Sequence, residues 1–140
     1  MSPGERQPVP VRFAGYAAVF NHIDNGGDVI RPGAFAESLK GGRTVPLLWQ
    51  HRTGTVIGRI EALREDNKGL RVIAQVGGGA SAGQVAGLIR SGRLKGLSFG
   101  YRVRQSQALD GARELSKLEL VEVSVVSRPM QPRALIHKVQ

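Results

Sequence analysis

Alternating apolar and polar positions run along most of this chain and predict a series of short β-strands. Successive side chains of a strand point to opposite faces, so such alternation is typical of a strand with one face against a core. The clearest case is LELVEVSVVS at residues 118–127. The predicted strands are residues 11–20, 44–51, 56–63, 70–76, 94–104, 118–127 and 134–139, and residues 113–118 are expected to start another strand.

Two segments have the features of helices. Proline and glycine punctuation predicts a short helix over residues 32–42, and apolar spacing predicts a second over residues 84–93. Residues 21–28 are expected to form a polar turn and residues 105–111 a loop. About seven short strands with two helices predict a mostly β fold with flanking helices, either a β-barrel or an α+β arrangement.

The length of 140 residues allows one domain with one hydrophobic core. The polar, proline-rich start MSPGERQPVP predicts a flexible arm over residues 1–10, followed by a single domain over residues 11–140. This start is not expected to act as a signal peptide. No apolar run approaches the roughly 18 residues of a membrane span, so we expect no membrane partner.

The charge balance is strongly basic. Twenty Lys and Arg residues against eleven Asp and Glu residues give a formal net charge of +9. Such a field attracts polyanions, either nucleic acid or an acidic protein, although a merely basic surface is an equally good interpretation. Aromatic residues make up only 5% of the chain and offer few platforms for stacked bases. The lack of cysteine excludes disulfides, a thiol nucleophile and a cysteine-based zinc site.

Ser98 is the first candidate for chemistry, in the sequence GLSFG at residues 96–100. This sequence matches the nucleophile elbow of α/β-hydrolases, but YRVR follows it as continued strand and His137 is the only later histidine, so that fold is rejected. On a strand, Ser98 shares its face with Gly96 and Gly100. We therefore expect it to stand in cleared space, which a nucleophile attacking a peptide carbonyl needs. The alternative is a small residue with no role beyond the strand.

His51 is the second candidate, at the end of a predicted strand in LWQHR. Its near-neutral intrinsic pKa suits a general base, and strand ends often project side chains into a cleft. The alternative is an exposed histidine without a catalytic role.

Glu122 is the third candidate, predicted to share a strand face with Leu118, Leu120 and Ser124. A carboxylate in such an apolar setting should have a partner, because an unpaired buried charge is very costly. Glu122 is expected either to orient a catalytic histidine or to form a structural salt bridge with an arginine.

Other chemistry has less support in the sequence. We expect no catalytic role for His22 or His137, and the three histidines have no metal-ligand spacing. Asp24 and Asp28 bracket a glycine turn and could bind a cation, but turn chemistry explains them. GGGASAGQ lacks the ending of a P-loop. We therefore expect neither a metal nor a cofactor.

Taken together, four segments resemble the serine-type prohead (procapsid) protease family of tailed phages, the HK-ninety-seven type. The combination of PGAF, LWQH, KGLSFGY and LxEVSVV is far more specific than any one of these motifs. The segments occur in the family's order and are GYAAVFNHIDNGGDVIRPGAF (15–35), VPLLWQHRTGTVIGRI (45–60), GRLKGLSFGYRV (92–103) and LELVEVSVVSRPMQPRAL (118–135).

The resemblance implies a fold and a set of site residues. The family is similar to herpesvirus maturation proteases, which implies a β-barrel surrounded by helices. It implies Ser98 as nucleophile, His51 as base and Glu122 as the third catalytic residue. It also implies that backbone N–H groups and water held by Arg128 meet the oxyanion. Ser98 and His51 should then lie on neighbouring strands within, or nearly within, hydrogen-bond reach.

The resemblance also implies a biological setting. It implies a serine endopeptidase without a cofactor that processes the major capsid protein or its scaffold segment during prohead maturation. Self-cleavage and homodimer formation are further implied possibilities, and whether the chain is self-trimmed stays open. The place of action would be the host bacterial cytoplasm, inside the assembling prohead of a phage, a prophage or a gene transfer agent. The alternative from another class is a non-catalytic basic protein that assists capsid assembly or binds nucleic acid.

Overall fold

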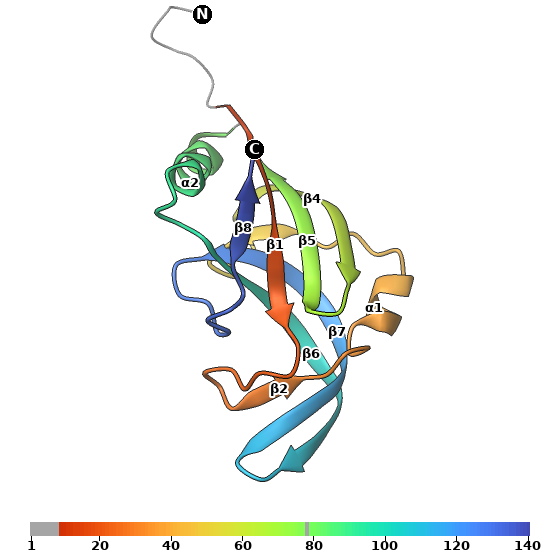
Figure 1. Cartoon of the computed structure of the whole chain (residues 1–140). Helices are drawn as coiled ribbons and strands as arrows, with labels where there is room; N and C mark the ends of the chain where they lie inside the picture. The colour runs from red at the N-terminus through yellow and green to blue at the C-terminus, as the bar shows by residue number, and fades with distance from the viewer. Residues whose placement is uncertain (1–8, 78) are drawn as a thin grey trace, which may run out of the picture.

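The computed structural model describes residues 9–77 and 79–140 (Figure 1). Eight strands and two helices lie within these residues. In chain order the elements are β1 (Val11–Val19), β2 (Asp28–Ile30), α1 (Ala36–Lys40), β3 (Leu47–Trp49), β4 (Val56–Glu65), β5 (Gly69–Val76), α2 (Ala80–Arg90), β6 (Gly96–Leu109), β7 (Ala112–Val126) and β8 (Ile136–Val139). The predicted mostly β fold with flanking helices is confirmed.

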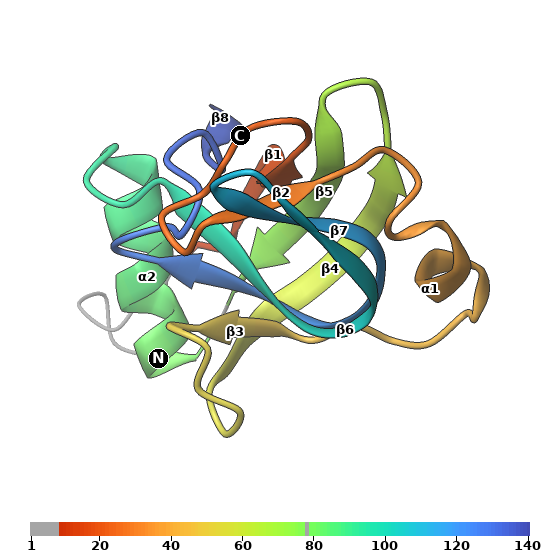
Figure 2. The ribbon, with the colours of Figure 1, turned by 90° about the horizontal axis from the view of Figure 1, so that it is seen from below.

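The strands form one strongly curled sheet (Figures 1 and 2). Neighbouring strands follow the order β2-β7-β3-β4-β5-β1-β8, and β6 also pairs with β7. The segment that leads into β8 joins the two ends of this curl. Leu97 N donates to Ala134 O at 2.9 Å, Ile136 N donates to Lys95 O at 2.8 Å, and Tyr16 N donates to Leu135 O at 3.1 Å. The sheet therefore curls into a small barrel, with the start of β6 at the seam.

The largest difference from the predicted elements lies in the hairpin of β6 and β7. The prediction of a loop at residues 105–111 is wrong, because β6 continues to Leu109 and β7 begins at Ala112. Between them Asp110 and Gly111 form a two-residue turn, with φ of 75° at Gly111. Both faces of β6 are exposed after Tyr101, so its side chains carry no apolar alternation there. This part of β6 can be recognised as a strand only from its backbone pairing with β7.

Two further differences are small. The three-residue strand β2 lies where the sequence predicts the end of a polar turn, and it pairs in parallel with the beginning of β7. The helix predicted from Pro32 begins only at Ala36. The cause is Glu65, whose carboxylate accepts hydrogen bonds from the N–H groups of Gly33 and Phe35 at 2.6 and 3.0 Å and holds a turn there.

The hydrophobic core fills the inside of the curl and fixes the strands that carry the candidate residues. Phe99 packs edge-on against Phe35, with ring centroids 5.2 Å apart, and lies 4.8 Å from the ring of Tyr101. Helix α2 covers one end of the barrel with Val85 and Ile89, as its apolar spacing predicts. Fully buried side chains from five strands complete this core: Phe13, Leu47, Leu70, Leu97 and Leu115.

The N-terminal arm predicted over residues 1–10 falls mostly on residues 1–8, which lie outside the described residues. Val9 and Pro10 lie outside any strand, and their carbonyl oxygens accept hydrogen bonds from Arg90. In the described part of the chain, neither helix has the length and apolar character that a membrane crossing requires.

Candidate active site

Strand β7 is the centre of the candidate site. It carries Glu122 and Ser124, and it pairs with β6 on one side and β3 on the other. Ser98 on β6 is directly opposite Ser124 in the antiparallel register. His51 follows two residues after the end of β3. The expectation that Ser98 and His51 lie on neighbouring strands is therefore wrong, because β7 runs between the two strands that bring them here.

His51 reaches the face of β7 through an unusual turn. Gln50 and His51 have φ of 51° and 61°, in the left-handed region where a residue other than glycine costs about 1–2 kcal/mol. Local hydrogen bonds hold this turn. His51 N donates to Ser124 Oγ at 3.0 Å, and Gln50 N donates to Val125 O at 3.0 Å. Strained backbone of this kind persists at sites where the surroundings over-determine it.

The carboxylate of Glu122 is the partner of both His51 and Ser124. His51 Nδ1 is hydrogen-bonded to Glu122 Oε1, and Ser124 Oγ donates to Glu122 Oε2 at 2.6 Å. Only 8% of the Glu122 side chain is exposed. Among the ion pairs of the described residues, none joins Glu122 to an arginine. The histidine-orienting interpretation of Glu122 therefore fits the geometry, and the arginine salt bridge does not.

The hydrogen bond from Glu122 raises the pKa of His51 above its ordinary value, burial of the ring opposes this shift, and the charge of Glu122 adds to it. A carboxylate at Nδ1 also fixes the tautomer, since it accepts a hydrogen bond from the Nδ1–H group and leaves Nε2 as the acceptor. Because the folded-state pKa of His51 is raised, the pair stabilises the fold fully below the unfolded pKa of about 6.5. That contribution is lost as the pH rises through the folded-state value.

A β-bulge places Glu122 on the outer face of β7. Gly100 is opposite Glu122, but Tyr101 is opposite Leu120, so Val121 is an extra residue on β7. Leu118 and Leu120 consequently point into the core while Glu122 lies on the other face. The prediction that these leucines share a face with Glu122 is wrong, because strict alternation does not hold across a bulge.

The two serines on this face have different surroundings. Ser124 is fully buried, accepts a hydrogen bond from His51 N and donates to Glu122, so its hydroxyl is committed. Ser98 Oγ makes no hydrogen bond with any described residue, to His51 included. Within the described residues every fully buried side-chain nitrogen or oxygen has a partner, so Ser98 Oγ keeps contact with solvent although the residue is only 7% exposed. Ser98 is therefore the free hydroxyl of the site.

The glycines that flank Ser98 do not clear empty space. A Cβ atom at Gly100 would lie 2.6 Å from Oε1 of Glu122, and one at Gly96 would lie 2.5 Å from the carbonyl oxygen of Val126. The expectation of cleared space is wrong in this respect. Gly100 provides the room that the Glu122 carboxylate occupies, and Gly96 allows β7 and Pro129 to approach closely.

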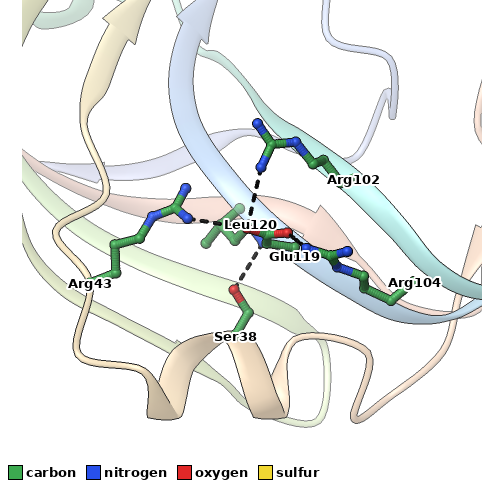
Figure 3. Close-up of polar contacts among 6 residues, drawn as sticks. All are labelled: Ser38, Arg43, Arg102, Arg104, Glu119 and Leu120. Carbon is green, nitrogen blue, oxygen red and sulfur yellow. Dashed lines mark hydrogen bonds and ion pairs between the residues drawn. The ribbon is translucent and has the colours of Figure 1, made fainter.

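The other acids of β7 are committed elsewhere. Glu119 pairs with Arg43, Arg102 and Arg104, as Figure 3 shows, while the neighbouring backbone N–H of Leu120 donates to Ser38 Oγ at 2.9 Å. Glu114 pairs with Arg31 at 2.7 Å. Glu122 is the acid of β7 that contacts His51.

The remaining sequence candidates lie apart from this cluster. His137 packs against Tyr16, with ring centroids 5.6 Å apart. Asp24 accepts hydrogen bonds from the N–H groups of Gly26 and Asp28, as its turn chemistry predicts. Asp28 pairs with Arg113 at 2.9 Å. In the described ranges, no three His, Asp or Glu side chains gather in a way that could hold a metal ion.

Arg128 lies two residues beyond β7 and is exposed. It lines a groove with Gly96 at the start of β6, and no carboxylate of the described residues pairs with it. Its guanidinium is thus free to face a ligand on the side of β6 that leads to Ser98.

The sequence resembles known proteins along most of its length. The profile of the family described as caudovirus prohead serine protease matches residues 5–140. The prohead protease of Enterobacteria phage HK97 is 34% identical over 128 residues, which are 87% of this chain and 57% of that protein. The chain thus spans little more than half the length of this curated relative.

Solved structures show the same fold at low sequence identity. The capsid assembly protease of bacteriophage T4 superposes with a TM-score of 0.68 at 16% identity, over 91% of this chain and 93% of that one. A herpesvirus enzyme, KSHV protease in complex with a hexapeptide phosphonate inhibitor, superposes with a TM-score of 0.65 at 13% identity, over 94% of this chain and 65% of that one. The expected herpesvirus-protease-like barrel is confirmed.

The contact between His51 and Glu122 predicts the effect of Glu122→Gln. This change keeps the shape of the side chain and removes its charge. We expect the pKa of His51 to fall, since burial, the remaining influence, lowers it. NMR titration of the His51 ring protons measures this shift. The pKa of His137, which burial and Arg71 lower, should be the same in both proteins. An unchanged pKa of His51 would show that the pair does not form in solution.

The close approach at Gly100 predicts a second effect. Gly100→Ala should displace the Glu122 carboxylate and lower the free energy of unfolding by about 1–3 kcal/mol, as overpacking does. Gly87→Ala, in helix α2 with open space at its Cβ, is the matched control and should be neutral or stabilising by up to about 1 kcal/mol. Urea denaturation of the three proteins measures the difference. Equal stability of Gly100→Ala and wild type would contradict the assigned role of Gly100.

Proposed function

Since the chain belongs to the caudovirus prohead serine protease family, we propose that it is a serine endopeptidase that processes capsid or scaffold protein during assembly of a phage-type prohead. The observation that carries this proposal is the bonded pair of His51 and Glu122, set across β7 from the free hydroxyl of Ser98. The proposed substrate is the major capsid protein or its scaffold segment, and the proposed place of action is the inside of the prohead in the bacterial host.

In the proposed mechanism Ser98 Oγ attacks the scissile carbonyl carbon. His51 Nε2 takes the hydroxyl proton as the C–O bond forms, and then gives it to the leaving amine nitrogen as the C–N bond breaks. A water molecule, activated by the same nitrogen, hydrolyses the acyl ester and restores Ser98. Glu122 holds the Nδ1 proton and stabilises the imidazolium that forms in between.

Two further residues have proposed supporting roles. Ser124 is a positioning residue, because its hydroxyl joins the backbone of His51 to the carboxylate of Glu122. Arg128 is proposed to help hold the oxyanion, which its exposed position next to Gly96 allows. Movement of the His51 turn would bring Nε2 into hydrogen-bond reach of Ser98, since catalytic hydrogen bonds often tighten only when substrate binds.

The alternative is a non-catalytic basic protein that assists capsid assembly or binds nucleic acid. Such a protein has no need of a nearly buried carboxylate paired with a histidine, and the cluster on β7 therefore favours the protease. Self-cleavage and homodimer formation, which the family resemblance also implies, stay predictions, because no contact among the described residues bears on either.

Cleavage of a co-expressed capsid precursor tests the proposal. Ser98→Ala should fold normally and lower the rate by about a thousandfold or more, whereas Glu122→Gln should retain more activity. In wild type kcat/KM should rise with pH through the raised pKa of His51, because the base must be neutral. In Glu122→Gln the midpoint should move to lower pH. A Ser98→Ala protein that cleaves at the wild-type rate would exclude Ser98 as the nucleophile.

A further inference from the structure

A groove of about 650 Å³ opens beside the start of β6, on the side of Ser98 that faces away from Gly100. Leu94, Gly96 and Pro129 are among the residues that line it. Gly96 precedes Ser98 by two residues on the same strand face, so the groove begins about 7 Å from the proposed nucleophile. A polypeptide with its scissile bond at Ser98 that runs along β6 toward Gly96 would therefore reach the groove.

Three cations surround this groove, namely Arg93, Lys95 and Arg128. All three are exposed, and none pairs with a carboxylate of the described residues. No Asp or Glu is among the residues that line the groove. The positive charge of these three side chains is therefore not balanced by a carboxylate of the described residues.

The backbone of the groove is well fixed. Lys95 O accepts a hydrogen bond from Ile136 N at 2.8 Å, and Leu97 N donates to Ala134 O at 2.9 Å, so the seam of the barrel holds this stretch. Charged groups on a rigid element recognise a ligand at lower entropic cost than groups on a mobile loop.

Cations on the opposite side of Ser98 differ in this respect. Arg102 and Arg104 follow Ser98 along β6, but both pair with Glu119, together with Arg43 (Figure 3). Their charge is partly neutralised within the protein itself. On the side of Gly96, by contrast, no carboxylate of the described residues pairs with the cations of the groove.

We propose that the groove binds an acidic segment of the substrate, with Asp or Glu side chains within about four residues of the scissile bond on one side. This inference rests on the proposed protease function and names the substrate class of the same site. Lys95 lies three residues before Ser98, which corresponds to about 10 Å of extended chain and so to the third or fourth substrate residue. Nucleic acid is the less suitable occupant, because no aromatic residue lines the groove for base stacking.

Cleavage of a library of defined peptides by the full chain tests the proposal, with products identified by mass spectrometry. We expect Asp and Glu to be enriched at one or more of the four positions on one side of the cleaved bonds. Arg93→Gln/Lys95→Gln should lose this enrichment. The kcat/KM of this double variant for a selected acidic peptide should be about fivefold lower than that of wild type, as expected for the loss of two exposed charge pairs. Its kcat/KM for the same peptide with Gln and Asn in place of Glu and Asp should equal that of wild type.

Arg64→Gln/Lys40→Gln is the matched control, because it removes one exposed arginine and one exposed lysine that line no part of the groove. This control should cleave both peptides at the wild-type rate. In addition, raising the salt concentration should slow cleavage of the acidic peptide more strongly for wild type than for Arg93→Gln/Lys95→Gln, which keeps only Arg128 of the three cations.

These experiments distinguish failure of the proposed protease function from failure of the proposed substrate class. If wild type cleaves no peptide and no capsid precursor, the proposed function fails. If it cleaves peptides without acidic enrichment, or if both double variants behave alike, the function stands and the substrate class is wrong. Binding of a single-stranded oligonucleotide that is lost in Arg93→Gln/Lys95→Gln, with peptide cleavage unchanged, would assign the groove to nucleic acid and overturn the proposal.

Discussion

The nearly buried carboxylate of Glu122 is the constraint to which the rest of the site conforms. A buried carboxylate without partners would cost several kcal/mol, so each neighbouring element must satisfy it. Ser124 and His51 occupy its two oxygens, and Gly100 on the facing strand leaves the space that it fills. The bulge at Val121 turns it away from the core. The carboxylate of Glu122 thus explains why Gly100, Ser124, the bulge at Val121 and the turn at His51 occur together.

The same constraint explains why the site is built on strands and completed by a turn. Strands β6 and β7 are anchored by core side chains on one face, which leaves Ser98 and Glu122 on a firm outer face. His51 comes from a turn in which two residues adopt left-handed backbone. In the proposed mechanism the acid and the nucleophile therefore have fixed places on strands, and the base is carried by a hydrogen-bonded turn.

The sequence was sufficient to predict the fold class and the three residues on this face, but not how they are arranged. Motif patterns single out Ser98, His51 and Glu122 because their residue types and order are distinctive. Strict two-residue alternation could not locate the bulge at Val121, since an extra residue changes the face without changing the apolar composition. The positioning role of Ser124 depends on that bulge and on the turn at His51, and both arise from tertiary pairing. The second half of β6 is likewise held by tertiary pairing with β7. Its exposed side chains show no apolar alternation that could have predicted a strand.

The identity of the reactive hydroxyl is the central claim, and covalent labelling measures it most directly. The full chain would be treated with a fluorophosphonate, which reacts with activated serine, and the labelled peptide would be mapped by mass spectrometry. We expect one label, on Ser98, at a rate that rises with pH as His51 loses its proton and that drops sharply in His51→Ala. A label on Ser124, or a label on Ser98 at the same rate without His51, would contradict the assignment of Ser98 and His51 as nucleophile and base.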